Sequence, residues 1–351
     1  MLPRALALPA VLALLAPAPA RAAAACDPST EQVRFFQDAL DAWETITRDL
    51  LRIPRPALPW MLLFDRTCVY HLGADPAALP GRPSPRAALR FSAEAVPVHA
   101  FAIGEAVALP RGDTVPVRGQ AFTGVFGDGP SARPFFVAAL PEVWRHDPAY
   151  AGDPEDWPPF VLSVLAHELV HTLQIVAVRE RLEQLSSRFP GLPVDLDDDL
   201  LQKRYGGVPG VEPTVRAEIA LLYAAHEEGR PQAARELAAR GLALLRARRA
   251  TYFGARLEPL GALEDTFLNM EGLACWAALQ VERRRRPAAA AAASLDEFRG
   301  GRKWWSQEEG LALFLLLDRF VPDWRTRVLP PELASPVALL EQAVAPSPGA
   351  R

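Results

Sequence analysis

Cysteine is scarce in this chain of 351 residues, which contains only Cys26, Cys68 and Cys275. Their wide spacing matches no cysteine-based metal site, because such sites use pairs of cysteines close together in sequence. The odd number is consistent with one disulfide and one free thiol. Cys26 and Cys68 both lie in the N-terminal part and are the expected pair, and Cys275 is expected to be a buried thiol.

An excess of positive charge is also absent, since 38 Lys and Arg against 42 Asp and Glu give a formal net charge of −4. A mildly acidic chain is a poor candidate for nucleic-acid binding, which depends on neutralising phosphates. The one strong basic cluster, Arg283–Arg286, precedes a proline and six alanines, which favours a helix end or linker over a binding patch. Beyond the N-terminus no apolar run reaches the length of about 18 residues that a stable membrane span needs.

The N-terminus has the pattern of a secretory signal peptide. A positively charged start is followed by an apolar run through Leu15 and by the small-x-small sequence Ala20–Ala22. Cleavage after Ala22 would remove two arginines and change the net charge from −4 to −6. We therefore expect an exported protein, periplasmic or secreted, with a lipid anchor on Cys26 as the less favoured alternative. An oxidising location permits the expected disulfide between Cys26 and Cys68.

Hydrophobic periodicity divides the remaining chain into a helix, a β-rich region and a helical region. Apolar residues at helical spacing predict a helix over 30–52. Strands are predicted at 60–72, 96–103, 115–126 and 135–140, and helices over 158–345, interrupted by a long loop at 185–213. The expected fold is α+β, with an N-terminal, mainly antiparallel β-sheet followed by a mostly helical lobe. The predicted boundaries are 1–22 for the signal peptide, 23–157 for the helix and β-rich region, and 158–351 for the helical lobe, the last two forming one domain.

The most informative stretch is His167-Glu168-Leu169-Val170-His171. Helical residues four apart lie on one face, so both imidazoles can reach a single metal ion. The mostly apolar flanks from Val161 to Val176 contain no Pro or Gly and predict an uninterrupted, buried helix. Buried imidazoles and a buried carboxylate need partners, which a metal ion supplies. This is the H-E-x-x-H pattern of zinc hydrolases; two core histidines bonded to backbone carbonyls are the alternative.

A catalytic zinc site needs a third protein ligand and an open position for water. The pattern H-E-x-x-H-x-x-G-x-x-H is excluded, because Gln174 and Ala177 occupy its last two fixed positions. A carboxylate on a later helix is the remaining route. Glu271 is the best candidate, since its neighbours at helical spacing, Phe267, Leu268, Ala274 and Cys275, make an apolar stripe.

Other residues stay open as the third ligand. They are Glu218, His226, Glu264, Asp265, Glu308 and Glu309. Glu264 lies two turns before Glu271 on the same face and is interpreted as a supporting or substrate-facing carboxylate or as part of a salt bridge. Glu309 begins a second Glu-Gly-Leu-Ala string that repeats Glu271–Ala274, in a more polar setting.

The run Asn269-Met270-Glu271-Gly272-Leu273-Ala274 resembles the Asn-Glu-Gly-x-Ala run of gluzincin aminopeptidases, zinc metallopeptidases with an H-E-x-x-H helix and a downstream Glu ligand. The likeness extends loosely over 135–280, but this chain has one extra residue between Asn and Glu. Glu271 also follows His171 by 100 residues, which is a much longer separation than in the best-known members. Cys275 stands where thermolysin-like members have an acid that orients the first histidine. The resemblance implies zinc bound by His167, His171 and Glu271, and a sheet-edge strand along the cleft that pairs with extended substrate. Residues 135–140 are the candidate for that strand; an interior strand is the alternative.

The chemistry that follows is hydrolysis of a peptide bond. Zinc lowers the pKa of a bound water and polarises the carbonyl, while Glu168 takes the water's proton and hands it to the leaving amine. The tetrahedral oxyanion needs a second stabiliser. Tyr223 is our prediction for it, with Tyr205, Tyr252 and His226 as alternatives.

Two other functions remain open beside a zinc metallopeptidase with a peptide or protein substrate. One is a zinc amidohydrolase that acts on a non-peptide amide, such as a cell-wall component. The other is a non-catalytic scaffold that keeps zinc, which the intact Glu168 disfavours.

Overall fold

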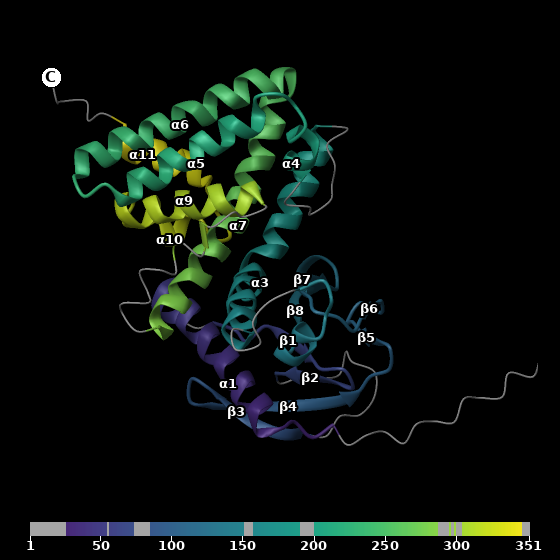
Figure 1. Cartoon of the computed structure of the whole chain (residues 1–351). Coiled ribbons are helices and arrows are strands. Elements are labelled where there is room, and N and C mark those ends of the chain that lie inside the picture. The colour runs from purple at the N-terminus through teal and green to yellow at the C-terminus, as the bar shows by residue number, and fades with distance from the viewer. Residues whose placement is uncertain are drawn as a thin grey trace, which may run out of the picture.

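The computed structural model of the chain describes residues 26–54, 56–73, 85–150, 157–189, 200–286, 295, 298–299 and 304–345. The expected signal peptide at 1–22 lies outside the described residues. Within them, a β-sheet and the first helix form one end of the molecule, and most of the later helices form the other (Figure 1). The predicted α+β class, with a mostly antiparallel sheet before a mostly helical part, is confirmed.

The α-helices are α1 (Thr30–Glu44), α2 (Pro141–Arg145), α3 (Trp157–Arg188), α4 (Leu200–Tyr205), α5 (Val211–Glu227), α6 (Pro231–Phe253), α7 (Leu257–Arg285), α9 (Trp305–Phe320), α10 (Trp324–Arg327) and α11 (Pro336–Val344). A π-helical segment, η1 (Thr45–Leu50), continues α1, and short 3-10 turns lie at η2 (Gly129–Ser131) and η4 (Gly254–Arg256). The strands are β1 (Trp60–Phe64), β2 (Cys68–Leu72), β3 (Pro85–Phe91), β4 (Glu94–Ala102), β5 (Ala106–Ala108), β6 (Thr114–Pro116), β7 (Ala121–Phe126) and β8 (Arg133–Ala139).

The main sheet has the order β3-β4-β2-β1-β8-β7, and β5 pairs with β6 in a small separate ribbon. Among the strand pairs in the described part of the main sheet, β1–β8 is parallel and the others are antiparallel. The strand predicted at 135–140 is β8, and it lies inside the sheet between β1 and β7, so the prediction of an edge strand is wrong and the interior alternative is correct. Its burial explains this position: Phe135 to Ala139 are all fully buried, as suits a strand covered on both faces. The edge strand at this side is β7, whose side chains are all half-buried.

Helix α1 is fixed at its start by a capping box and by a nearby disulfide. The Ser29 hydroxyl accepts from the backbone N–H of Gln32, whose side chain accepts from the backbone N–H of Ser29. Cys26, just before the helix, forms a disulfide with Cys68 on β2, which confirms the predicted pair. Cys275 is free and buried, as predicted.

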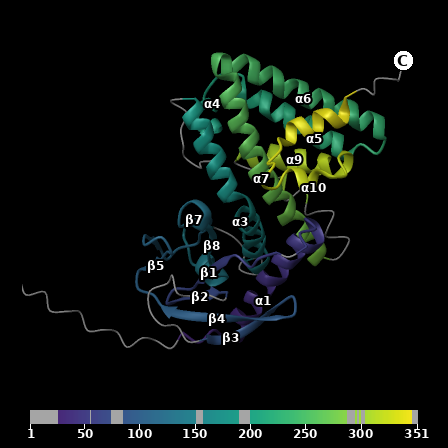
Figure 2. The same ribbon diagram turned by 180° about the vertical axis from the view of Figure 1, so that it is seen from behind.

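Helix α3, which carries the H-E-x-x-H motif, runs from the sheet to the far helices (Figures 1 and 2). It packs against β7, β8, α1 and α7. Among the described residues it is the one helix long and apolar enough to cross a membrane, and 61% of its most apolar window is buried inside the protein. A single cluster of buried side chains continues from the sheet through α3 into α7 and α9, across the predicted boundary at 157 and 158.

The helix bounds in the helical part contradict the predicted long loop and confirm the predicted helix end. The stretch 185–213 is not one loop, because α3 continues to Arg188 and α4 and the start of α5 fall within it; residues 190–199 lie outside the described part. The prediction of a helix end at Arg283–Arg286 is confirmed, since α7 ends at Arg285. Arg284 and Arg285 form exposed ion pairs with Asp49 and Asp38, which link this end to the N-terminal helix.

The repeated Glu-Gly-Leu-Ala strings mark the crossing of α7 and α9. A Cβ atom at Gly272 would lie 2.6 Å from the backbone carbonyl of Gly310, and one at Gly310 would lie 2.7 Å from the Cα atom of Gly272. Only glycine at both positions therefore lets the two backbones touch. The crossing places Glu271 against α3 and Glu309 against a different group of charges on α5 and α6.

Candidate metal centre

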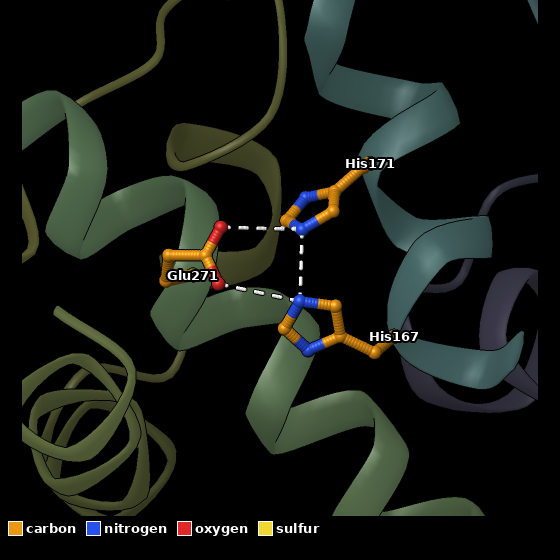
Figure 3. Close-up of side chains that lie close together, drawn as sticks. All are labelled: His167, His171 and Glu271. Carbon is orange, nitrogen blue, oxygen red and sulfur yellow. Dashed lines mark hydrogen bonds and ion pairs between the residues drawn. The ribbon is translucent and has the colours of Figure 1, made fainter. Parts of the chain in front are cut away.

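His167 and His171, one turn apart on α3, point toward Glu271 on α7 (Figure 3). The His167 Nε2 atom lies 3.2 Å from Glu271 Oε2, and the His171 Nε2 atom lies 3.3 Å from Glu271 Oε1. The two Nε2 atoms are 2.9 Å apart. Among the described residues this is the one cluster of His, Cys, Asp or Glu with ligand atoms close enough for a metal ion. The structure thus brings together the three ligands predicted from the sequence, and this buried cluster can hold a metal ion of unspecified identity.

The electrostatics of the three residues favour a cation between them. Burial raises the pKa of Glu271, but the neighbouring charges and hydrogen bonds of His171 and His167 outweigh it and hold this pKa well below its usual value. Burial lowers the pKa of His167, but Cys275 and Glu271 outweigh it and raise this pKa well above its usual value. A carboxylate that is 3% exposed and has lost most of its water needs such a partner. The imidazole proton and a metal ion are alternative ways to supply the positive charge.

Each ligand also has a partner behind it. The Cys275 sulfur lies 3.7 Å from His167 Nδ1, and the Gln174 Oε1 atom lies 3.3 Å from His171 Nδ1. Gln307 on α9 donates to Glu271 Oε2 at 3.0 Å. Such partners fix the orientation of ligating side chains. The sequence analysis did not identify Gln174 and Gln307 as supporting residues. The sequence signal for Gln174 was a polar residue within a mostly apolar helix.

Glu168, the predicted general base, is half-buried and reaches the sheet edge. The Thr123 hydroxyl on β7 lies 2.8 Å from both the Glu168 Oε2 atom and the Glu168 backbone carbonyl, and can donate to either. Strand β7 therefore runs directly beside the motif. The sequence did not identify Thr123 as a functional residue. Its contact is with a residue 45 positions later, and the local sequence of a short strand carries no information about such a distant contact.

Tyr223, predicted to stabilise the oxyanion, is buried on α5. Its hydroxyl donates to the backbone carbonyl of Glu308 at 3.3 Å, and the Arg299 guanidinium lies over its ring. Its role as an oxyanion stabiliser stays a prediction. The phenol would have to leave the Glu308 carbonyl to fulfil it.

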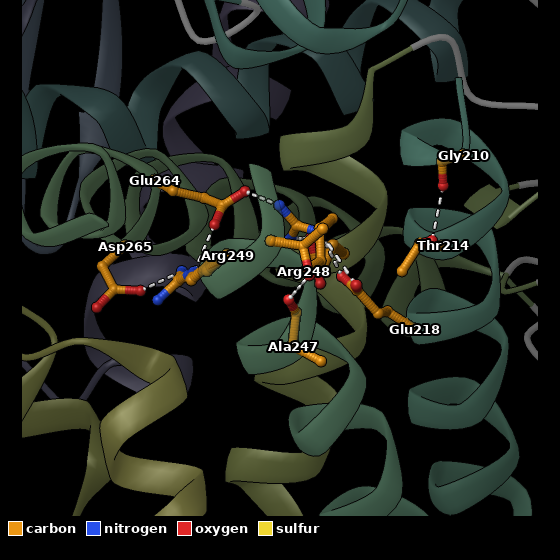
Figure 4. Close-up of polar contacts among 10 residues, drawn as sticks. Gly210, Thr214, Glu218, Ala247, Arg248, Arg249, Glu264 and Asp265 are labelled. Atoms are coloured by element: carbon orange, nitrogen blue, oxygen red, sulfur yellow. Dashed lines mark hydrogen bonds and ion pairs between the residues drawn. The ribbon is translucent and has the colours of Figure 1, made fainter. Parts of the chain in front are cut away.

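Four of the six other candidate ligands, Glu218, Glu264, Asp265 and Glu309, belong to a separate buried network around two arginines (Figure 4). Arg248 donates to Glu218 at 2.9 Å and to Glu264 at 2.8 Å, and Arg249 pairs with Glu264 and with Asp265 at 2.6 Å each. Arg248 also lies 3.6 Å from Glu309. The interpretation of Glu264 as part of a salt bridge is therefore correct, and none of these acids contacts the two motif histidines.

The last two candidates lie elsewhere. Glu308 pairs with Arg216. His226 lines a separate surface pocket with Glu227, Glu228 and Arg283, and the residues that line it do not include His167, His171 or Glu271. Burial, followed by the charges of Arg283 and Arg319, lowers its pKa.

The Arg248 network leads to a prediction about pH. Burial raises the pKa of Glu309, the charges of Glu218 and Glu264 raise it further, and Arg248 only partly offsets them. A carboxyl whose pKa is raised on folding stabilises the protein fully below its unfolded pKa, and this stabilisation is lost as pH rises through the folded pKa. Glu309→Gln removes this proton, so the loss of stability above about pH 4.5 should become shallower by up to about 1.4 kcal/mol per pH unit. Thermal unfolding of both proteins across pH 4 to 9 measures the slopes, and equal slopes would show that Glu309 is ionised in the folded state.

No protein-family model, no curated protein and no solved structure matches this chain. The function of the chain is therefore inferred from the buried group of His167, His171 and Glu271 and from the elements that surround it.

Proposed function

We propose that this chain is an exported zinc metallopeptidase of the gluzincin type, which hydrolyses peptide bonds with Glu168 as general base. The observation that carries the proposal is the convergence of His167, His171 and Glu271, from two helices, beside Glu168. Two motif histidines with a carboxylate from a later helix are the ligand set that the gluzincin likeness implies, although the separation of 100 residues is much longer than in the best-known members.

The donor set and its dimensions suit zinc. Two imidazole nitrogens and one carboxylate are a common set for catalytic zinc, with one position left for water. Ligand atoms about 2.0–2.1 Å from a tetrahedral zinc lie roughly 3.3 Å from one another. The two Nε2 atoms are 2.9 Å apart, and each lies near that distance from a different Glu271 oxygen, His167 Nε2 at 3.2 Å from Oε2 and His171 Nε2 at 3.3 Å from Oε1. Bound here, zinc would supply a Lewis acid for the carbonyl and lower the pKa of the attacking water.

The side chains of this protein would supply proton transfer and position. Glu168 directly follows the proposed ligand His167 in the sequence, and it would accept the proton of the attacking water and deliver it to the leaving amine. The Thr123 hydroxyl, 2.8 Å from Glu168 Oε2, holds the carboxylate from the sheet side. Gln307 holds Glu271 from the opposite side, on α9.

The sheet edge supports a peptide substrate over a non-peptide amide. In the described part of the sheet β7 pairs only with β8, so its other edge is available to a further strand. An extended peptide that adds to this edge runs antiparallel or parallel to β7 and passes Thr123, which contacts the general base. Small cell-wall amides would not need such a strand.

Export and catalysis each have a supporting feature. The disulfide between Cys26 and Cys68 suits an oxidising compartment, as the signal-like N-terminus also suggests. The contact of Thr123 with Glu168 favours an enzyme over a zinc scaffold, because a scaffold does not need a positioned base.

Glu168→Gln is the test of this function. The amide keeps the size of the side chain and its acceptor for Thr123 but cannot take a proton. We expect zinc content to stay at the wild-type level and cleavage of fluorogenic peptides to fall by about 100-fold or more, the usual contribution of general base catalysis. Metal analysis and a peptide-library assay on the mature, disulfide-bonded protein measure both.

Thr123→Val is the companion variant. It removes only the hydroxyl contact with Glu168, so it should lower the rate less than Glu168→Gln and leave zinc unchanged. Undiminished cleavage by Glu168→Gln would refute the mechanism. Zinc binding without cleavage of any peptide, but with release of amines from wall fragments, would favour the amidohydrolase.

A further inference from the structure

We propose that two backbone carbonyl groups, those of Val328 and Ala334, set the tautomer of the ligand His171 through a relay of two buried amides, Asn269 and Gln174. This inference rests on the metal centre of the proposed function but does not need its peptidase activity. Asn269 and Gln174 are thereby positioning residues, which act on the metal through His171.

The first step is the side chain of Asn269, which is 4% exposed. Its Nδ2 atom lies 3.2 Å from the carbonyl oxygen of Val328 and 2.8 Å from that of Ala334. A backbone carbonyl can only accept a hydrogen bond, so both amide hydrogens of Asn269 must face these two groups. The opposite orientation would place three acceptors together in a buried site, at the cost of leaving each of them unsatisfied. The Asn269 Oδ1 atom therefore faces the other way, toward Gln174.

The second step is the side chain of Gln174, which is fully buried on α3. Its Nε2 atom lies 3.3 Å from Asn269 Oδ1 and 3.4 Å from the Asn269 backbone oxygen. Both of these atoms are acceptors, so the amide nitrogen of Gln174 must be the group that faces them. The Gln174 Oε1 atom is left on the side of His171, 3.3 Å from its Nδ1 atom.

The third step is the imidazole itself. An amide oxygen can only accept, so the His171 Nδ1 atom must carry a hydrogen. In the neutral ring the Nε2 atom then has a free lone pair, directed at Glu271 and His167. This is the tautomer that binds a metal through Nε2. Glu271 alone would favour the other one, because its carboxylate, 3.3 Å from Nε2, attracts a hydrogen onto that nitrogen.

The relay joins parts of the chain that are far apart in sequence. Val328 and Ala334 flank the segment between α10 and α11, which is held by the hydrogen bond from the Ala334 N–H to the Arg327 carbonyl at 2.8 Å and by Arg181, which donates to the Leu333 carbonyl. Gln174 is 95 residues from Asn269, and Asn269 is 65 residues from Ala334. Because both amides are buried, water cannot readily replace either of them.

Two substitutions at Gln174 separate positioning from packing. Gln174→Met keeps the length and removes the acceptor for His171, so zinc affinity should fall by about 10- to 100-fold. Gln174→Glu breaks the contact with Asn269 but still accepts from the His171 Nδ1–H group. It should lower stability and yet restore zinc affinity to within about 3-fold of wild type. Thr266→Val, on α7 one turn before Asn269, is the matched control, since it also loses one buried hydrogen bond, to the Ala262 carbonyl, without touching the relay.

Zinc affinity by competition with a chromophoric chelator is the first readout, and the imidazole ¹H–¹⁵N spectrum of the wild-type protein is the second. The spectrum should show a hydrogen on Nδ1 of His171, with and without zinc. Equal zinc affinity in Gln174→Met and Thr266→Val would overturn the proposal, as would a zinc-free neutral His171 with its hydrogen on Nε2.

The two readouts also separate the relay from the proposed function. If the wild type binds zinc and cleaves no peptide, the proposed peptidase function is refuted, and the zinc affinities of the Gln174 variants still test the relay. If Gln174→Met does not fold, or if the wild type binds no zinc, the Nδ1 hydrogen of His171 in the wild-type spectrum decides the relay alone.

Discussion

Glu271→Ala is expected to purify with almost no bound metal, whereas the wild type should carry close to one ion per chain. The substitution removes both oxygens that face the Nε2 atoms of His167 and His171, at 3.2 and 3.3 Å. It leaves two imidazoles one turn apart, which is too few ligands for a stable zinc site. Peptide cleavage should be lost together with the metal. Metal analysis by mass spectrometry after dialysis against zinc-buffered solution measures the content.

Glu309→Gln is the matched control for this loss. Glu309 begins the same Glu-Gly-Leu-Ala string on α9, is as deeply buried as Glu271, and lies beside Arg248 rather than beside the histidines. It should keep its metal. Equal zinc in wild type and Glu271→Ala would remove Glu271 as a ligand, and loss of zinc in Glu309→Gln alone would transfer that role to α9.

The comparison of these two glutamates shows how far the sequence could lead. His167, Glu168 and His171 were predictable because one helix turn fixes their relative positions. Glu271 was predictable in type, as a carboxylate on an apolar stripe, and only the packing of α7 against α3 brings it to the histidines. Glu309 has nearly the same local sequence, so no local pattern separates the two. The crossing at Gly272 and Gly310 separates them by directing one to α3 and the other to α6.

The same reasoning explains what the sequence could not reveal. The order of strands in a sheet is a property of the whole fold, so β8 was an equally good candidate for an edge or an interior position, and β7 took the edge. Thr123 and Gln307 act on the candidate centre through contacts with residues 45 and 36 positions away. Arg248 and Arg249, which hold the acidic candidates, lie 15 or more residues from every acid they pair with. Pairings of this kind depend on tertiary packing and leave no periodic signal.

Gly272→Ala should be among the most damaging single-methyl substitutions in the helical part. The added Cβ atom would lie 2.6 Å from the carbonyl carbon and oxygen of Gly310 and 2.7 Å from Phe314 Cδ2. The carbonyl belongs to the α9 backbone and cannot rotate away, so α7 and α9 must separate. Overpacking of this kind costs about 1–3 kcal/mol or more, and this exceeds the gain of roughly 1 kcal/mol that alanine brings to a helix. Urea unfolding should show the net loss, with zinc affinity reduced as well, because Glu271 is the preceding residue.

Gly261→Ala supplies the comparison on the same helix. A Cβ atom there would meet only the Arg249 Nη1 atom, at 3.9 Å, which is an ordinary contact. It should therefore stabilise the protein by up to about 1 kcal/mol through helix propensity alone, with zinc affinity unchanged. The two substitutions add the same methyl group to α7, so their difference isolates the helix crossing. If Gly272→Ala proved as stable as Gly261→Ala, the backbones of α7 and α9 would not be in close contact at this crossing. The different partners of Glu271 and Glu309 would then need another explanation.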